Sequence, residues 1–227
     1  MTDRPLIFSA PMISALLAGR KTQTRRILKP QPYPFVTDGR PYWNARGCIG
    51  GRISISDAEL LRLHRWVVGD RLYVREAWAP LDALTHNDPG TRAFAEKGFY
   101  RADQGTVDGE ISRWRPSIHM PRWASRLTLL VADIRVQRLQ DISQADSEAE
   151  GIYERGSVGD GSSHDRWTWQ REGWRYATPR EAFRELWGLI NGPDAWAANP
   201  WVAAVSFSVI RSNIDATPLP SPAQGGK

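Results

Sequence analysis

The residues best suited to do chemistry in this 227-residue chain lie together near its start. The segment 20–29, Arg-Lys-Thr-Gln-Thr-Arg-Arg-Ile-Leu-Lys, holds five basic residues and no acidic one. If it is a strand, its side chains alternate between two faces, so Thr24 lies beside Arg26 and Lys21 has the opposite parity. Lys21 then joins Thr24 only from a turn after Gly19, or by reaching round on its long stem. A hydroxyl, an amine and a fixed cation suit acyl transfer; a solvated basic strand edge is the alternative.

A second candidate group lies in a loop that two prolines interrupt, where arginines alternate with aromatic rings. Its members are Trp114, Arg115, His119, Arg122, Trp123 and, just beyond, Arg126. Arginine binds phosphate through two hydrogen bonds, and aromatic rings stack on bases. The pattern therefore predicts a surface for single-stranded nucleic acid. In the alternative interpretation the tryptophans close one end of the fold and the arginines are ordinary surface charge.

Other chemistries find little support in the sequence. The four histidines are scattered, and the single cysteine, Cys48, excludes an internal disulfide and a multi-cysteine zinc site, so we expect no metal and no cofactor. Ser163, His164 and Asp165 are consecutive, whereas members of a catalytic triad meet in space. No glycine-rich phosphate loop follows a strand.

The composition is that of a soluble globular protein. Thirty Lys and Arg against 25 Asp and Glu give a net charge of +5, with 41% hydrophobic and 24% charged residues and 11 Trp. The excess of arginine over lysine is a weak indication of an anionic partner. No apolar run approaches the roughly 18 residues of a membrane helix, and the N-terminus has no secretory pattern. We expect a reducing cytoplasm and no membrane contact, and the sequence predicts no particular protein partner.

The elements that must position these residues are irregularly spaced. We predict strands at 5–9, 20–28, 71–78, 126–139 and 201–210, a hairpin around 99–101, and helices at 11–17, 56–66, 144–152 and from Thr178 to about 191. A parity shift between Leu129 and Leu130 suggests a bulge or a barrel corner. In helix 144–152, Ala145, Ala149 and Ile152 mark the inner face, so Glu150 faces solvent or a cleft.

This order is not that of alternating strand–helix–strand units. It predicts an α+β fold: a small mixed or antiparallel β-barrel with peripheral helices. We expect one domain over 1–212, with insertions at about 30–66, 80–113 and 153–177, and a disordered tail over 213–227 that is rich in proline and glycine. Residues 156–173 are expected to form a mobile loop.

The stretch from Ala18 to Arg26 resembles the signature of the ASCH superfamily, a Gly-x-Lys-Thr-x-Thr-x-Arg-like motif after the first helix. The later order is also similar: a Gly-Asp turn and strand from Gly69, then a long strand leading into a short helix. In the compact members known as N(4)-acetylcytidine amidohydrolases, a glutamate lies eleven residues after a strand-end leucine, and counting from Leu139 gives Glu150. Over roughly residues 5–210, with Trp114–Trp123 and Asn199-Pro200-Trp201 among the matching segments, the chain resembles longer ASCH-like proteins common in phages and prophages.

The resemblance implies a PUA-like barrel associated with RNA binding and RNA modification. It implies that Lys21, Thr24 and Glu150 are the catalytic set, with Arg26 also matching the motif. We expect Arg20, Arg25 and Arg26 to contact a nucleoside or RNA. Three functions stay open: hydrolysis of an acylated cytosine amide, binding of RNA or a modified base without turnover, and ribonuclease chemistry with Glu150 as base.

Overall fold

The computed structural model divides the chain into two compact units, each built from separate segments. Unit 1 comprises Met1–Gly19, Gly69–Val131 and Phe207–Lys227, and unit 2 comprises Arg20–Val68 and Ala132–Ser206. The structure describes residues 3–29, 31, 33–34, 41–44, 52–54, 66–80, 98–103, 111, 113–155, 166–170 and 175–217. Two of the four unit boundaries fall inside the long strands at 128–138 and 201–210, and the other two follow Gly19 and Val68.

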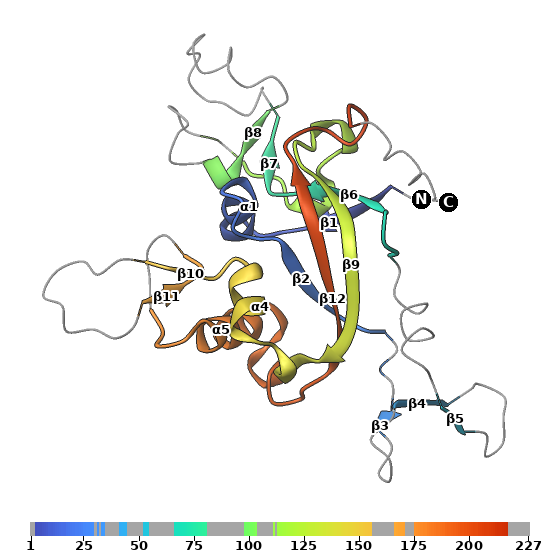
Figure 1. Cartoon of the computed structure of the whole chain (residues 1–227). Helices are drawn as coiled ribbons and strands as arrows, with labels where there is room; N and C mark the ends of the chain where they lie inside the picture. Colours follow the sequence, from blue (N-terminus) through green and yellow to red (C-terminus); the bar gives the residue numbers. More distant parts are fainter. Residues whose placement is uncertain are drawn as a thin grey trace, which may run out of the picture. The chain divides into compact units, whose positions relative to one another are not determined.

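A mixed five-stranded sheet, in the order β1-β6-β9-β12-β2, is the main element of the fold (Figure 1). Its strands are β1 (Arg4–Ile7), β6 (Arg71–Arg75), β9 (Thr128–Arg138), β12 (Trp201–Ile210) and β2 (Gln23–Ile27). In unit 1, β1 pairs parallel with β6, and β6 pairs antiparallel with the start of β9. In unit 2, β12 pairs antiparallel with β2, from Val202 opposite Ile27 to Ser206 opposite Gln23. The predicted α+β class is confirmed, but no closed barrel is found among the described strands.

The helix starts follow local sequence signals. α1 (Ala10–Leu17) has Pro11 in its first turn and ends before Gly19, whose φ is 72°. α5 (Pro179–Asn191) begins with a complete capping box, in which the Thr178 hydroxyl accepts from the Glu181 backbone and the Glu181 carboxylate accepts in return from Thr178. The predicted capping role of Thr178 is confirmed.

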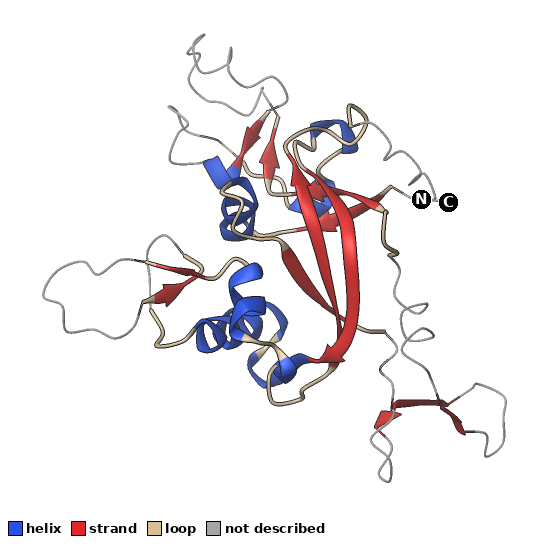
Figure 2. Ribbon diagram, viewed as in Figure 1, coloured by secondary structure: helices blue, strands red, loops and turns tan. Residues whose placement is uncertain are grey.

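Unit 2 also contains the short helix α4 (Gln144–Ala149), which packs against α5 (Figure 2). The Ser143 hydroxyl caps α4 by accepting from the backbone of Asp146. The predicted inner face is wrong at Ala145, which is exposed, and right at Ile152, which is buried; Ser147 and Glu150, which it left out, are also buried. The helix is turned so that polar side chains, rather than alanines, face the sheet.

The predicted insertions are structured where the structure describes them. A three-stranded antiparallel sheet joins β3 (Tyr33–Pro34), β4 (Pro41–Asn44) and β5 (Arg52–Ser54). A two-stranded pair joins β10 (Tyr153–Glu154) and β11 (Trp167–Thr168), so the predicted loop over 156–173 is wrong at Trp167–Thr168, which form a strand. The helix predicted over 56–66 lies, from 56 to 65, outside the described residues.

Unit 1 adds the pair β7 (Trp78–Ala79) and β8 (Phe99–Tyr100), so a strand lies in the predicted hairpin region, but its partner is the distant segment Trp78–Ala79 and not a neighbouring strand. Short 3-10 helices follow: η2 (Arg101–Asp103), η3 (Ser117–His119) and η4 (Arg122–Ala124). Two more such turns, η5 (Leu139–Asp141) and η6 (Pro193–Ala195), belong to unit 2. No helix in the described parts of the chain is long and apolar enough to cross a membrane.

Two further predictions, one for strand β9 and one for the C-terminal tail, need correction. The alternation in β9 breaks at Ala132 and Asp133, which are both exposed, and not between Leu129 and Leu130. The tail was predicted to be disordered from 213, but Asn213, Ile214 and Thr217 are buried in unit 1. Hydrogen bonds hold this segment, and composition alone does not reveal them. Residues 218–227 lie outside the description.

Candidate active site

A buried ion pair joins the two ends of the candidate site in unit 2. The Lys21 ammonium donates to Glu150 Oε2 at 2.7 Å and to the Glu150 backbone carbonyl at 2.8 Å, across 129 residues of sequence. The Lys21 side chain is 0% exposed and that of Glu150 4%. A lysine and a glutamate placed together out of solvent interact strongly, because little water screens their charges.

Local backbone structure brings this pair together. After the positive-φ Gly19, Lys21 forms an isolated antiparallel bridge with Glu150, and Thr22 N donates to Ala149 O at 2.8 Å. Glu150 is the C-cap of α4, and Gly151, with φ of 102°, turns the chain away. Lys21 therefore lies just before β2 on the same side as Gln23 and Arg25, so the predicted turn that would bring it beside Thr24 is not found.

A second carboxylate on α4 completes the cluster. Arg25 donates to Glu150 Oε1 at 3.2 Å and to Asp146 Oδ2 at 3.0 Å, and Gln23 Nε2 donates to Asp146 Oδ1 at 3.2 Å. Arg25 also donates to Gln23 Oε1 at 2.6 Å. Lys21, Gln23 and Arg25 share one parity of the strand, and Asp146 and Glu150 are one helical turn apart. The side chains on this face of β2 therefore lie opposite the two carboxylates of the α4 segment.

Thr24 belongs to the other face of β2. Its side chain is buried, and its hydroxyl accepts a hydrogen bond of 3.0 Å from Arg26 Nη1. Arg26 is close enough to the ion pair for its charge to act on Lys21, and the charge of Glu150 acts on Arg26 in turn. Arg26 therefore contacts Thr24 by a hydrogen bond and interacts with Lys21 and Glu150 through its charge.

The electrostatics favour a reactive lysine. Burial lowers the pKa of the Lys21 ammonium, Glu150 opposes this shift, and the charges of Arg26 and Arg25 add to it. Burial also lowers the pKa of Arg26, again opposed by Glu150, although a guanidinium stays charged in proteins. An amine with a lowered pKa is a better proton acceptor near neutral pH.

Sequence reasoning located part of this site. It named Lys21, Thr24 and Glu150, and the structure brings Lys21 and Glu150 into direct contact. Arg20 is exposed and lies over the Tyr153 ring at 4.1 Å, so its predicted binding role stays a prediction. Arg25 does not fit such a role, because its side chain is 0% exposed and bound to protein acceptors.

Asp146 and Gln23 were missed as members of the cluster. The four-residue spacing of Asp146 and Glu150 on one helix and the shared parity of Lys21, Gln23 and Arg25 were visible in the sequence. Neither pattern by itself tells which strand faces which helix.

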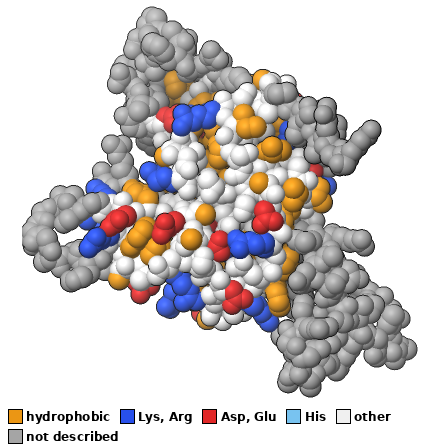
Figure 3. Space-filling model, viewed as in Figure 1, with side chains coloured by type: hydrophobic (Ala, Val, Ile, Leu, Met, Phe, Trp, Pro, Cys, Tyr) orange, Lys and Arg blue, Asp and Glu red, His pale blue; other side chains and the backbone are white. Residues whose placement is uncertain are grey.

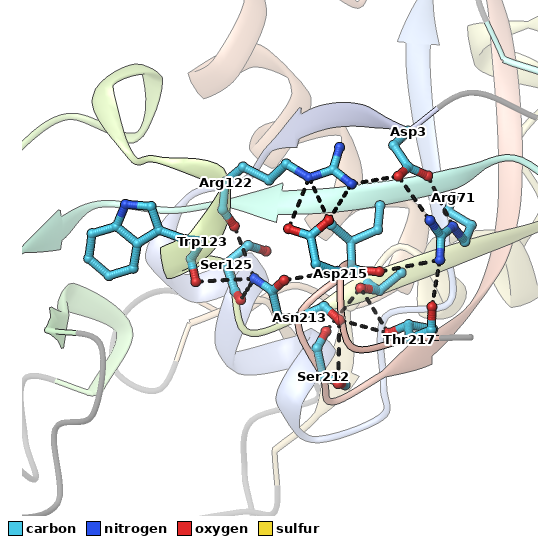
Figure 4. A network of polar contacts seen from close by, with 11 residues as sticks. Asp3, Arg71, Arg122, Trp123, Ser125, Ser212, Asn213, Asp215 and Thr217 are labelled. Atoms are coloured by element: carbon cyan, nitrogen blue, oxygen red, sulfur yellow. Dashed lines mark hydrogen bonds and ion pairs between the residues drawn. The ribbon is translucent and has the colours of Figure 1, made fainter. Parts of the chain in front are cut away.

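The predicted nucleic-acid loop of unit 1 is partly neutralised. Arg122 forms ion pairs with Asp3 and Asp215, both at 2.6 Å, and Asp3 also binds Arg71 (Figure 4). The hydrogen bond to Asp215 raises the pKa of Arg122, and the hydrogen bond to Asp3 adds to this. Asp215 of the C-terminal segment thus binds the Arg122 guanidinium, which the sequence analysis expected to contact phosphate.

Asn213 anchors that segment beside the loop. Its amide donates to the carbonyls of Arg122, Trp123 and Ser125 at 3.0, 3.2 and 2.7 Å (Figure 4). Its own Oδ1 accepts from the backbone of Asp215 at 2.9 Å. The segment after β12 is therefore held by specific hydrogen bonds to the loop.

Arg126 is also paired within unit 1. Glu76, which is 1% exposed, accepts from Arg126 Nε at 2.9 Å, and Asp103 forms a second ion pair with the same guanidinium. Burial raises the pKa of Glu76, and Arg126 opposes the shift. The Arg126 guanidinium lies 4.0 Å from the centroid of the Tyr100 ring, and burial raises the pKa of Tyr100 to about 12.

The remaining loop residues divide into packed and exposed ones. Trp114 packs on the cluster of Ala79 and Phe99 and is only half-buried. Arg115 and His119 are exposed, and Trp123 is 55% exposed, with its ring edge-on to Trp78 at 5.6 Å. These three side chains are exposed, and their role in binding nucleic acid stays a prediction.

The visible face of the molecule carries mixed charge. Figure 3 shows basic and acidic side chains close to one another over the described residues, without one continuous basic area. Within the same residues no group of three or more His, Cys, Asp or Glu side chains could hold a metal ion. Cys48 and His64, His86 and His164 lie outside the description.

No protein-family model matches this chain, and neither the curated proteins nor the solved structures contain a match to it.

Proposed function

We propose that unit 2 carries an amidohydrolase-type site that removes an acyl group from the exocyclic amine of a cytosine nucleoside or of cytosine in RNA. The buried Lys21–Glu150 pair, with Nζ to Oε2 of 2.7 Å, carries this proposal. It is supported by the resemblance to the ASCH superfamily, with the mixed sheet taken as the described part of a PUA-like barrel. No cofactor is required by the chemistry.

The chemistry is hydrolysis of an amide: an oxygen nucleophile attacks the acyl carbon, and the bond to the cytosine nitrogen breaks. Lys21 accepts the proton of the nucleophile when its amine is neutral, and the departing nitrogen takes that proton up. Arg26 stabilises negative charge on oxygen, since its Nη1 already donates to Thr24 Oγ1. Glu150 orients the Lys21 amine through the hydrogen bond between Oε2 and Nζ.

Two versions of the nucleophile stay open. In the first, Thr24 Oγ1 attacks and forms an acyl ester that water then cleaves. In the second, water attacks and Thr24 only positions the substrate. Mass spectrometry of the protein after rapid quenching distinguishes them, because only the first leaves an acetyl group on Thr24.

The direct test is incubation of the purified chain with N(4)-acetylcytidine, following cytidine release. We expect Lys21→Ala, Thr24→Ala and Glu150→Gln each to reduce turnover by about 100-fold or more. Thr22→Ala and Lys29→Ala are matched controls, because both side chains are exposed and are not part of the cluster. An inactive parent protein, or turnover that survives all three substitutions, would overturn the proposal.

The second candidate is binding of single-stranded RNA by unit 1, favoured by the exposed Trp123 ring and the exposed Arg115, whose guanidinium lies 5.7 Å from the Trp78 ring. Fluorescence anisotropy with a short labelled RNA at increasing salt tests it. We expect Trp123→Ala to weaken binding by about tenfold, with affinity falling as salt rises. Fragmentation of the RNA that Glu150→Gln abolishes would instead indicate a nuclease.

A further inference from the structure

Arg25 has an unusual position for a strand arginine. Its side chain is 0% exposed, and its guanidinium faces the α4 helix, where both carboxylates of the cluster lie. Nη1 is shared between Gln23 Oε1 and Glu150 Oε1, and Nη2 binds Asp146 Oδ2. The guanidinium carbon also lies 5.8 Å from the Phe183 ring centroid. These contacts fix the planar fork in one orientation.

The spacing of the two elements explains why one arginine reaches both acids. Alternate residues of a strand are about 6.6 Å apart, and residues four apart on a helix rise by about 6 Å. Lys21 and Gln23 therefore stand opposite Glu150 and Asp146, and the long Arg25 side chain lies across the two carboxylates. Asp146 is held independently from β9, because Arg135 Nη2 donates to its Oδ1 at 2.9 Å.

Glu150 consequently receives a different cation on each oxygen. Arg25 binds Oε1 at 3.2 Å, and Lys21 binds Oε2 at 2.7 Å. A carboxylate held at one oxygen cannot rotate freely, so the other oxygen stays aimed at the lysine. The nearby guanidinium also acts on Lys21 electrostatically, since the charge of Arg25 helps to lower the pKa of its ammonium.

We infer that Arg25 is a positioning residue, which clamps Oε1 of Glu150 to the Asp146 anchor so that Oε2 stays directed at the Lys21 amine. This inference rests on the proposed hydrolase function for its effect on turnover. Arg25 itself touches no substrate. It acts through Glu150, and its fork geometry matters as well as its charge.

Two substitutions separate geometry from charge. Arg25→Lys keeps a cation but removes the fork, and we expect kcat to fall about tenfold with KM within about twofold. Arg25→Met removes the cation too, and we expect a loss of about 100-fold. The rising limb of the pH–rate profile moves to higher pH in Arg25→Met, because losing a neighbouring cation raises the pKa of Lys21, and it stays in place in Arg25→Lys.

A second measurement does not need turnover. The chain has four lysines, Lys21, Lys29, Lys97 and Lys227, so NMR of ¹³C-labelled lysine gives few signals, and Lys21→Met assigns the relevant one. We expect Lys21 to titrate at higher pH in Arg25→Met than in the parent. Arg135→Met is the matched control: it removes another contact of Asp146, its side chain is 48% exposed, and we expect no shift.

The outcomes are distinguishable. If the parent does not hydrolyse the amide, the proposed function fails, and a Lys21 titration that moves in Arg25→Met still shows that Arg25 acts on the Lys21–Glu150 pair. If the parent is active while both Arg25 variants keep its kcat and Lys21 titration, the positioning role is wrong. A lower melting temperature with unchanged kcat and titration means that Arg25 is only structural. Should Arg25→Met not fold, Arg25→Lys alone tests the positioning role: a lower kcat at unchanged KM supports it, and an unchanged kcat contradicts it.

Discussion

Two arginine-centred clusters, one in each unit, use the same side chains to different ends. In unit 2, Arg25 and Lys21 are wholly buried and face carboxylates on a single helix. In unit 1, the Arg122 side chain is 38% exposed and Asp215 58% exposed, and the carboxylates come from the two ends of the chain. Solvent screens the second cluster and not the first, so equal distances imply unequal energies.

The comparison also bears on function. A buried ion pair is a poor source of stability, because the cost of removing both charges from water offsets their attraction. Under the proposed function, the Lys21–Glu150 pair keeps a desolvated lysine available as a base. The Arg122 pairs need no such explanation, since they fasten the C-terminal segment.

The largest expected effect is on the buried pair. Lys21→Met leaves Glu150 buried without its closest cation, and we expect the free energy of unfolding to fall by about 3 kcal/mol. Urea denaturation followed by tryptophan fluorescence measures this. Lys29→Met is the control and stays within about 0.5 kcal/mol, because Lys29 is exposed. A Lys21→Met protein as stable as the parent would contradict the burial of this pair.

Asn213→Ala is expected to have the next largest effect. It leaves the carbonyls of Arg122, Trp123 and Ser125 without their shared donor, at a cost of about 2 kcal/mol. Thermal unfolding and proteolysis of the C-terminal segment report the loss. Asn191→Ala, which removes one bond at an exposed helix end, serves for comparison. Equal effects of the two substitutions would mean that the segment is not specifically anchored.

The pH dependence of stability is expected to have opposite signs at two acids. Burial alone raises the pKa of Asp146, but Arg135 and Arg25 outweigh it and the pKa lies below 3.8. The stability from Asp146 is therefore present above pH 3.8 and lost as pH falls through its folded pKa. Burial raises the pKa of Glu76 above 4.5, so its contribution improves as pH falls from that raised value toward 4.5.

Urea midpoints measured across this acidic range test both signs. Asp146→Asn removes the loss at low pH, and Glu76→Gln removes the gain at mildly acidic pH. Slopes that neither substitution changes would show that other carboxyl groups control the acid response.

The smallest effect is expected at the exposed cluster. Arg122→Ala should lower the free energy of unfolding by about 0.5 kcal/mol, and by less at high salt, because exposed ion pairs are weak and screened. Chemical denaturation at low and high salt measures this. A loss as large as that of Lys21→Met would remove the contrast between the two clusters.

Much of the secondary structure was predictable because its signals are local. The strand at 201–210 matches β12 in both bounds, and the hydroxyl, proline and glutamate from Thr178 to Glu181 gave the start of α5. Capping and alternation act within a few residues, so the sequence states them directly. The inner face of α4 could not be predicted in this way, because polar side chains of the cluster, not alanines, face the sheet.

The candidate site was predictable only as a set of residues. Lys21, Thr24 and Glu150 were named from the motif and the resemblance, but neither reveals that Glu150 is buried or that Asp146 and Arg25 complete its surroundings. The same limit applies to the arginine loop, where carboxylates far away in sequence bind Arg122 and Arg126.

The sequence by itself determined the composition, the basic segment without acids, the helix caps and the long final strand, because each depends on residues that are near neighbours. Only the tertiary structure decided which cations are buried, which carboxylates meet them and that Asn213 anchors the end of the chain. Burial and pairing depend on which distant segments pack together, and they determine whether an arginine positions a reacting group or fastens a surface.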